Sequence, residues 1–124
     1  MRKKILIVDD DATLIDTLCM AFELIGDFAV LKAQNGLDGV QKAEKFLPDI
    51  IVMDYKMPDI NGWEATRRIK KNDKTKHIPV IGYTGWAGLS DIKKGIKAGL
   101  SEIINKPFNI EKWEEKINKY LGQD

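Results

Sequence analysis

The most constraining feature of this sequence is a fivefold alternation of short apolar runs and longer segments with helical spacing. The apolar runs are unbroken, and they cover Ile5–Val8, Phe28–Leu31, Ile50–Met53, Val80–Ile81 and Ile103–Ile104. Unbroken runs of this length are typical of strands buried on both faces of a parallel sheet. Since strands that alternate with helices form parallel sheets covered by helices on both faces, the sequence predicts a three-layer, doubly wound α/β fold.

The segments between these runs predict five helices. Apolar residues recur at helical spacing over Leu14–Ile25, Leu37–Leu47, Leu89–Leu100 and Ile110–Leu121. Gly26 is placed to end the first of these helices, Ser90 or Asp91 to begin the third, and Asn109 to begin the last. A helix over Trp63–Lys71 has the weakest pattern, because only three of its residues are apolar.

Length and composition narrow the class of protein. A chain of 124 residues is expected to form a single domain, residues 1–124, with no output domain attached. Twenty basic residues against 19 acidic ones leave no overall field for direct binding of nucleic acid or a membrane surface. One cysteine, Cys19, and one histidine, His77, exclude a disulfide framework and argue against a zinc centre.

No segment is apolar for long enough to cross a bilayer, which takes about 20 residues. The first apolar run ends at Asp9, which makes it too short for the core of a signal peptide. A cytoplasmic location is therefore expected.

Chemically active residues follow four of the five predicted strands. Asp9, Asp10 and Asp11 follow the first strand and Asp54 follows the third, while Thr84 ends the fourth and Lys106 follows the fifth. In an open parallel sheet these strand ends lie along one edge, where ligands bind. Each residue alone has a simpler interpretation, such as a helix cap, a turn, a loop contact or a solvated charge, but together they predict a site.

The combination favours phosphoryl transfer. Two carboxylates about 4 Å apart repel by about 4 kcal/mol at an effective dielectric constant near 20. A divalent cation removes this cost, and Mg²⁺ prefers such oxygen ligands. The cation, a lysine ammonium and a threonine hydroxyl would together bind phosphoryl oxygens, and a carboxylate among them would be the nucleophile.

The chain resembles the receiver domain of two-component response regulators, of the single-domain type, over essentially its whole length. The matching segments are Ile5–Asp10, Asp49–Asp54 with Met57, Pro58 and Gly62, Val80–Thr84, Ala98–Gly99 and Lys106–Phe108. The resemblance implies a flavodoxin-like (βα)5 fold with strand order 2-1-3-4-5. It also implies a cis peptide bond between Lys106 and Pro107.

The resemblance further implies a signalling switch rather than a metabolic enzyme. Asp54 would accept a phosphoryl group from a sensor histidine kinase, a phosphotransfer protein or a small phosphodonor, and the domain would promote its own phosphorylation and dephosphorylation. Asp9, Asp10, Asp54 and the backbone carbonyl of Lys56 would hold Mg²⁺. Thr84 and Lys106 would bind the phosphoryl group, and a downstream protein would read the face formed by the fourth helix, the fifth strand and the fifth helix.

The sequence departs from the family pattern at Ile103, where the family usually has an aromatic switch residue. Because isoleucine is stiff at χ1, we expect residues 85–89 and the fourth helix to shift without a large rotamer change at Ile103. Lys56 and Trp86 occupy the two variable positions beside the pocket. The fluorescence of Trp86 is expected to report the shift, and Thr84→Ala to blunt that report.

Two alternatives remain open at this point. Asp9 and Asp11 also fit the DxDxT signature of haloacid-dehalogenase-like phosphatases, although that family needs a later acidic pair and would leave Asp54 without a role. A receiver-like binding module without phosphorylation is the second alternative, although such modules usually lack one of the site residues. The lysines of the fourth helix, Lys93, Lys94 and Lys97, form either a solvated face or part of a partner surface.

Overall fold

A computed structural model describes residues 2–85, 87–107 and 109–122. Ten elements alternate along the chain: β1 (Lys3–Val8), α1 (Ala12–Ile25), β2 (Phe28–Ala33), α2 (Gly36–Phe46), β3 (Ile50–Met53), α3 (Gly62–Lys71), β4 (Val80–Thr84), α4 (Leu89–Ala98), β5 (Glu102–Asn105) and α5 (Ile110–Leu121). The five strands form one parallel sheet in the order β2-β1-β3-β4-β5. The predicted doubly wound (βα)5 fold and strand order are confirmed.

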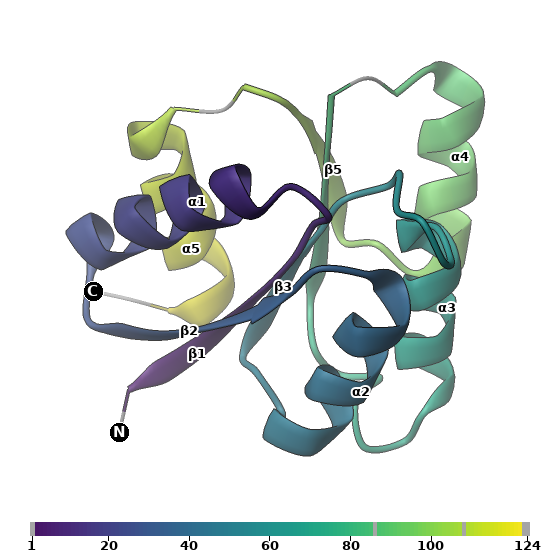
Figure 1. Cartoon of the computed structure of the whole chain (residues 1–124), viewed down its shortest axis with the longest axis horizontal. Coiled ribbons are helices and arrows are strands. Elements are labelled where there is room, and N and C mark those ends of the chain that lie inside the picture. The colour runs from purple at the N-terminus through teal and green to yellow at the C-terminus, as the bar shows by residue number, and fades with distance from the viewer. Residues whose placement is uncertain (1, 86, 108, 123–124) are drawn as a thin grey trace.

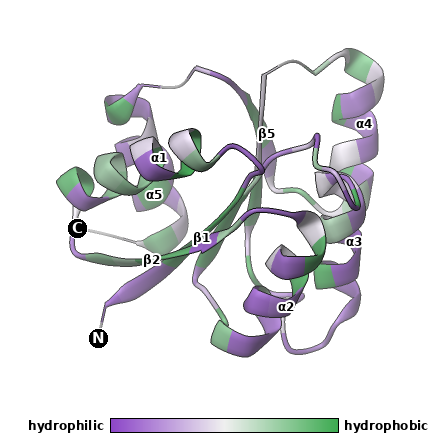
Figure 2. Cartoon of the chain, viewed as in Figure 1, coloured by the Kyte–Doolittle hydropathy of each residue, from purple (hydrophilic) through white to green (hydrophobic). Residues whose placement is uncertain are grey.

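The helices cover both faces of the sheet. Helices α1 and α5 lie on one side, and α2, α3 and α4 lie on the other (Figure 1). The strands are hydrophobic along most of their length, whereas the helices alternate hydrophobic and hydrophilic stripes (Figure 2). Neighbouring strand residues therefore serve different cores: Ile5 and Ile7 pack under α1 and α5, and Leu6 and Val8 pack under the other three helices.

Each core contains a buried tryptophan. Trp113 of α5 is buried and meets Phe22 and Tyr83 in edge-to-face contacts, with ring centroids 5.3 and 5.1 Å away. Trp63 of α3 is buried on the opposite face, and its ring centroid lies 4.8 Å from that of Tyr55. These aromatic contacts add to the burial of apolar area that holds the helices on the sheet.

Helix α3 forms despite its weak apolar pattern. The side chain of Asn61 accepts a hydrogen bond from the backbone of Glu64 and caps the helix. Glu64 in turn pairs with Arg67 and Arg68, one turn further along. Local capping and ion pairing thus supplement the burial of Trp63, Ala65 and Ile69, the three apolar residues of the pattern.

Helix α4 differs from the prediction at both ends. It begins after Gly88, rather than at Ser90 or Asp91, because Asp91 lies in the first turn and its carboxylate accepts a hydrogen bond from the Gly88 backbone. It ends at Ala98, two residues early, because Gly99 turns into the left-handed region at φ 115°. The predicted caps Gly26 and Asn109 are confirmed.

Several smaller features complete the description of the fold. Strands β4 and β5 extend beyond their apolar runs, to Thr84 and Asn105. His77 is exposed, and the Cys19 thiol is partly buried with a raised pKa, owing first to burial and then to its hydrogen bond with Glu23. Within the described ranges, no helix has the length and apolar character that crossing a membrane requires.

Candidate functional site

The chemically active strand ends meet at one edge of the sheet, as the sequence predicts, beside a cleft. Asp9 and Asp10 follow β1, Asp54 follows β3, Thr84 ends β4 and Lys106 follows β5. A cleft of about 480 Å³ is lined by Asp54, Tyr55, Lys56, Thr84, Gly85, Asp91 and Lys106. Residues that are far apart in the chain are thus brought to the carboxyl edge of the sheet.

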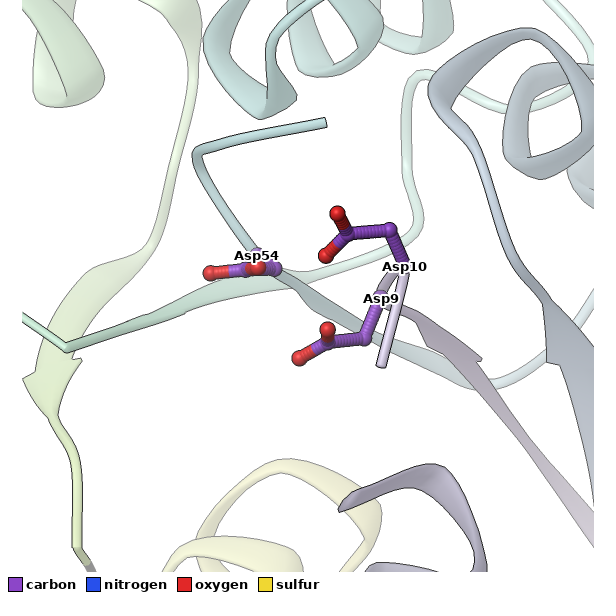
Figure 3. A group of neighbouring side chains, drawn as sticks. All are labelled: Asp9, Asp10 and Asp54. Carbon is purple, nitrogen blue, oxygen red and sulfur yellow. The ribbon is translucent and has the colours of Figure 1, made fainter. Parts of the chain in front are cut away.

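Three carboxylates lie side by side at this edge (Figure 3). One oxygen from each of Asp9, Asp10 and Asp54 lies within 4.8 Å of the others. Asp9 and Asp54 are only 2% and 7% exposed, while Asp10 is open to solvent. Oxygen donors on buried and exposed sides of one space suit a hard cation that keeps several waters.

The Lys106 ammonium lies between two of these carboxylates. Its Nζ is 3.0 Å from Oδ2 of Asp9 and 3.4 Å from Oδ1 of Asp54. Partial burial lowers the pKa of Lys106, but the hydrogen bond to Asp9 and the charge of Asp54 outweigh burial and raise it above its usual value. Lys106 therefore stays protonated and offers a fixed positive charge to anything bound at Asp54.

The Asp54 carboxyl has a strongly raised pKa. Its pKa is raised from 3.8 to about 6, first by burial and then by the negative charge of Asp9. Lys106 and the backbone N–H of Tyr55, which donates to Oδ1 at 2.9 Å, act in the opposite direction. A carboxylate that is costly to keep charged is stabilised by a nearby cation.

Backbone hydrogen bonds hold these acids in place. The Asp54 N–H donates to the carbonyl of Val8 at 2.9 Å, and the Asp11 N–H donates to Oδ1 of Asp9, also at 2.9 Å. The side chain of Asp11 caps α1 by accepting from Leu14. Of the three consecutive aspartates, Asp11 therefore serves as the helix cap, and Asp9 and Asp10 belong to the cluster.

The remaining predicted residues also reach the cleft. Thr84 is buried at the end of β4, and its carbonyl accepts a hydrogen bond from the backbone of Lys106 at 2.7 Å, which ties β4 to the segment after β5. Lys56 is exposed in the loop after β3. The peptide bond between Lys106 and Pro107 is cis, as predicted. Trp86, the predicted fluorescent reporter, lies outside the described residues.

Sequence reasoning missed three residues around the cleft. Tyr55 and Asp91 line it, and Trp63 lies behind them with its indole Nε1 donating to the Asp91 carbonyl at 3.0 Å. The position of Tyr55 directly after Asp54 was a usable signal. The hydrogen bond between Trp63 and Asp91 joins α3 to α4, and the two residues are 28 positions apart in the sequence. No local sequence pattern predicts such a contact.

Comparison with known proteins identifies the family. The model of the response regulator receiver domain matches residues 5–118. The chain belongs to this family. It is 32% identical over 122 residues to the polar-differentiation response regulator DivK of Brucella anthropi, an alignment that covers 98% of each chain.

Solved receiver domains share the fold. A CheY-like receiver domain protein from Methanospirillum hungatei superposes with a TM-score of 0.91 at 31% identity, covering 98% of this chain and 95% of its own. The receiver domain of a sensor histidine kinase from Pseudomonas aeruginosa gives a TM-score of 0.90 at 25% identity, covering 99% and 100%. That structure has a magnesium ion coordinated in its active-site cleft.

Family membership bears on one of the two alternatives, the phosphatase. A receiver domain is a signalling domain rather than a metabolic enzyme, which removes support for a haloacid-dehalogenase-like phosphatase built on Asp9 and Asp11. The acidic pocket of Asp9, Asp10 and Asp54 is consistent with a phosphorylation site.

Proposed function

We propose that residues 1–124 act as one receiver unit, a phosphorylation-dependent switch whose acceptor is Asp54. The observation that carries this proposal is the grouping of a nearly buried carboxylate, two further carboxylates within 4.8 Å and an ammonium 3.4 Å away. The phosphoryl donor is the phosphohistidine of a sensor histidine kinase or phosphotransfer protein, or a small phosphodonor. The protein works in the cytoplasm, without direct contact to nucleic acid or membrane.

The donor atoms of the cleft fit Mg²⁺. Asp9, Asp10 and Asp54 would hold the ion, together with the backbone carbonyl of Lys56, and water would complete its coordination. When bound, it supplies positive charge to phosphoryl oxygens. The magnesium in the Pseudomonas aeruginosa receiver domain supports this assignment.

The protein's own side chains carry the transfer. An Asp54 carboxylate oxygen attacks phosphorus, a P–O bond forms as the P–N bond of the phosphohistidine breaks, and the histidine nitrogen keeps the electron pair. Lys106 binds one phosphoryl oxygen from its place 3.4 Å from Asp54. The Thr84 hydroxyl binds another, and water later attacks the acyl phosphate in the same pocket.

The signal is read on the face formed by α4, β5 and α5. Leu89, Ile92 and Ile96 of α4 form an exposed apolar stripe, with Leu89 69% and Ile96 51% exposed. A downstream protein that covers this stripe would bury apolar surface, which is the main driving force of association.

The proposal is tested by phosphorylation with acetyl phosphate in the presence of Mg²⁺. We expect intact-mass spectrometry to show addition of one phosphoryl group, and hydroxylamine to remove it, because acyl phosphates react with this nucleophile. Asp54→Asn should abolish the addition.

Asp59→Asn is the matched control, because Asp59 lies in the loop after β3 but its carboxylate accepts from the backbone of Gly36 and Leu37 instead of facing the cleft. This variant should be phosphorylated like the wild type. Label on Asp9, or persistent label in Asp54→Asn, would refute the assignment of the acceptor.

A further inference from the structure

A second concave surface lies beside the cleft, between α3 and α4. This groove has a volume of about 470 Å³ and is lined by Tyr55, Asn61, Trp63, Glu64, Arg67, Lys94, Lys97 and Ala98. Helices α3 and α4 run next to each other on one side of the sheet (Figure 1). The groove uses a different stripe of α4 from the apolar stripe of Leu89, Ile92 and Ile96.

The groove is positively charged in a chain that is nearly neutral. Helix α3 has four basic residues and one acidic residue, and α4 has three basic residues and one acidic residue, while the whole chain carries a net charge of only +1. The rest of the chain is therefore net acidic. The charge asymmetry singles out this pair of helices as the surface that would attract an anionic partner.

The positive charges of the groove are available for a partner. Glu64 is the single acidic residue in its lining, and its carboxylate already pairs with Arg67 at one oxygen and Arg68 at the other. Lys94 and Lys97 are exposed, and among the described residues neither makes an ion pair. An acidic ligand would thus gain two ion pairs without breaking existing ones.

The floor of the groove is apolar. Half-buried Tyr55 packs against Trp63, and Ala98 closes the end near Lys97. Trp63 is only 6% exposed, since its ring also approaches Gly82 and Gly95 and its Nε1 is bonded to the Asp91 carbonyl. This indole face is closed to the base stacking on which single-stranded nucleic acid binding depends.

We propose that the groove between α3 and α4 is a docking site for an acidic segment of a partner protein that also carries an apolar side chain. The carboxylates of the segment would pair with Lys94 and Lys97, and its apolar side chain would cover Tyr55 and Ala98. Two lysines at the rim and an apolar floor match such a segment, whereas a nucleic acid would need a longer basic track and an open ring. The site is separate from the proposed phosphorylation and is present in the unmodified protein.

Tyr55 gives the groove a physical link to the cleft. Its side chain lines both concavities, and its backbone N–H donates to Oδ1 of Asp54. Trp63 provides a second link, because it lines the groove and holds the carbonyl of Asp91, which lines the cleft.

The test uses the unphosphorylated protein of 124 residues, so its result is independent of the acceptor assignment. The probe is a fluorescein-labelled peptide in which Glu and Asp alternate with Leu and Phe, and the reference peptide has every acid replaced by its amide. Fluorescence anisotropy should show binding of the acidic peptide that weakens with salt, and little binding of the amide peptide. Amide NMR shifts on titration should concentrate at Tyr55, Lys94 and Lys97.

Charge reversal at the rim tests the location. Lys94→Glu with Lys97→Glu should weaken the acidic peptide at least about tenfold, because two exposed ion pairs become repulsive contacts. The double variant Lys94→Ala with Lys97→Ala should weaken binding of the acidic peptide less. It keeps the test valid if the charge-reversal substitutions unfold α4. Lys3→Glu with Lys45→Glu is the matched control, because these exposed lysines lie outside the groove and change the net charge equally.

Three results would overturn the proposal. They are a dissociation constant for the acidic peptide weaker than about 1 mM, equal weakening in the control variant, and NMR shifts confined to residues other than Tyr55, α3 and α4. A different outcome is that single-stranded RNA or anionic vesicles bind while the acidic peptide does not, and that substitution of Lys94 and Lys97 weakens this binding. That outcome would assign the groove to another class of partner and would also refute a docked protein segment.

Discussion

Among the glycines whose surroundings the structure describes, Gly62 leaves the least room for an added side chain. A Cβ added there would lie 1.8 Å from the backbone oxygen of Asp54 and 2.8 Å from its carbonyl carbon, although real Cβ contacts almost never fall below 3.0 Å. The Gly62 N–H also donates to the Tyr55 carbonyl at 2.7 Å. The start of α3 is thus pressed against the backbone of the proposed acceptor.

We predict that Gly62→Ala destabilises the protein by about 3 kcal/mol. The Asp54 backbone cannot yield, since its N–H is bonded to Val8 in the centre of the sheet, so the start of α3 must move by about 1 Å. Overpacking of this kind costs about 1–3 kcal/mol, and loss of the Gly62–Tyr55 hydrogen bond adds about 1 kcal/mol. The higher helix propensity of alanine returns less than about 1 kcal/mol.

Urea unfolding followed by circular dichroism measures this change. The control is Gly85→Ala, in the same cleft, where an added Cβ meets no heavy atom within 4 Å, and its free energy of unfolding should stay within about 0.5 kcal/mol of the wild type. If Gly62→Ala also stays within about 1 kcal/mol, the close approach of α3 to Asp54 is not a real constraint and the reasoning fails.

Two further predictions concern the acids of the cleft. Asp10→Ala should lower Mg²⁺ affinity, measured by isothermal titration calorimetry, and slow phosphorylation by acetyl phosphate, because it removes one of three grouped carboxylates; unchanged affinity would mean that Asp10 is not a ligand. In metal-free protein, the raised pKa of Asp54 means that the folded state binds more protons than the unfolded state between about pH 4 and 6. The free energy of unfolding, taken relative to that of Asp54→Asn, should therefore fall by up to about 3 kcal/mol as the pH rises through that window. Urea unfolding of both proteins across this range measures the difference, and a constant difference would contradict it.

The sequence was sufficient for the sheet and for the site residues because both follow from strand ends. Buried parallel strands are recognisable as unbroken apolar runs, and their carboxyl ends must share one edge, so Asp9, Asp54, Thr84 and Lys106 had to converge. The same reasoning could not separate Asp11 from its neighbours. All three aspartates follow β1, and only the hydrogen bond to Leu14 shows which one caps α1.

Contacts between residues that lie far apart in the sequence could not be predicted from local sequence patterns. The apolar pattern of α3 suggested a weak helix, whereas the structure buries Trp63 in one of the two cores. Its bond to Asp91 depends on the register of α4, and the sequence misplaced the start of that helix by one to two residues. Local periodicity predicts which face of a helix is buried, but it does not predict that the Trp63 indole lies opposite the Asp91 carbonyl.

Trp63 also limits how α4 can move relative to α3. Ile103 is partly buried and points toward α4, where its Cδ1 would lie 2.9 Å from a Cβ at Gly95. The Trp63 ring approaches the same point, with Cε2 3.2 Å from that Cβ position. Because the Trp63 ring lies against Gly95 and its Nε1 donates to the Asp91 carbonyl, α4 cannot shift relative to α3 without moving Trp63 or breaking that bond. Both Ile103 and Trp63 therefore contact α4 at Gly95, and Trp63 also contacts Tyr55, whose backbone N–H is bonded to Asp54.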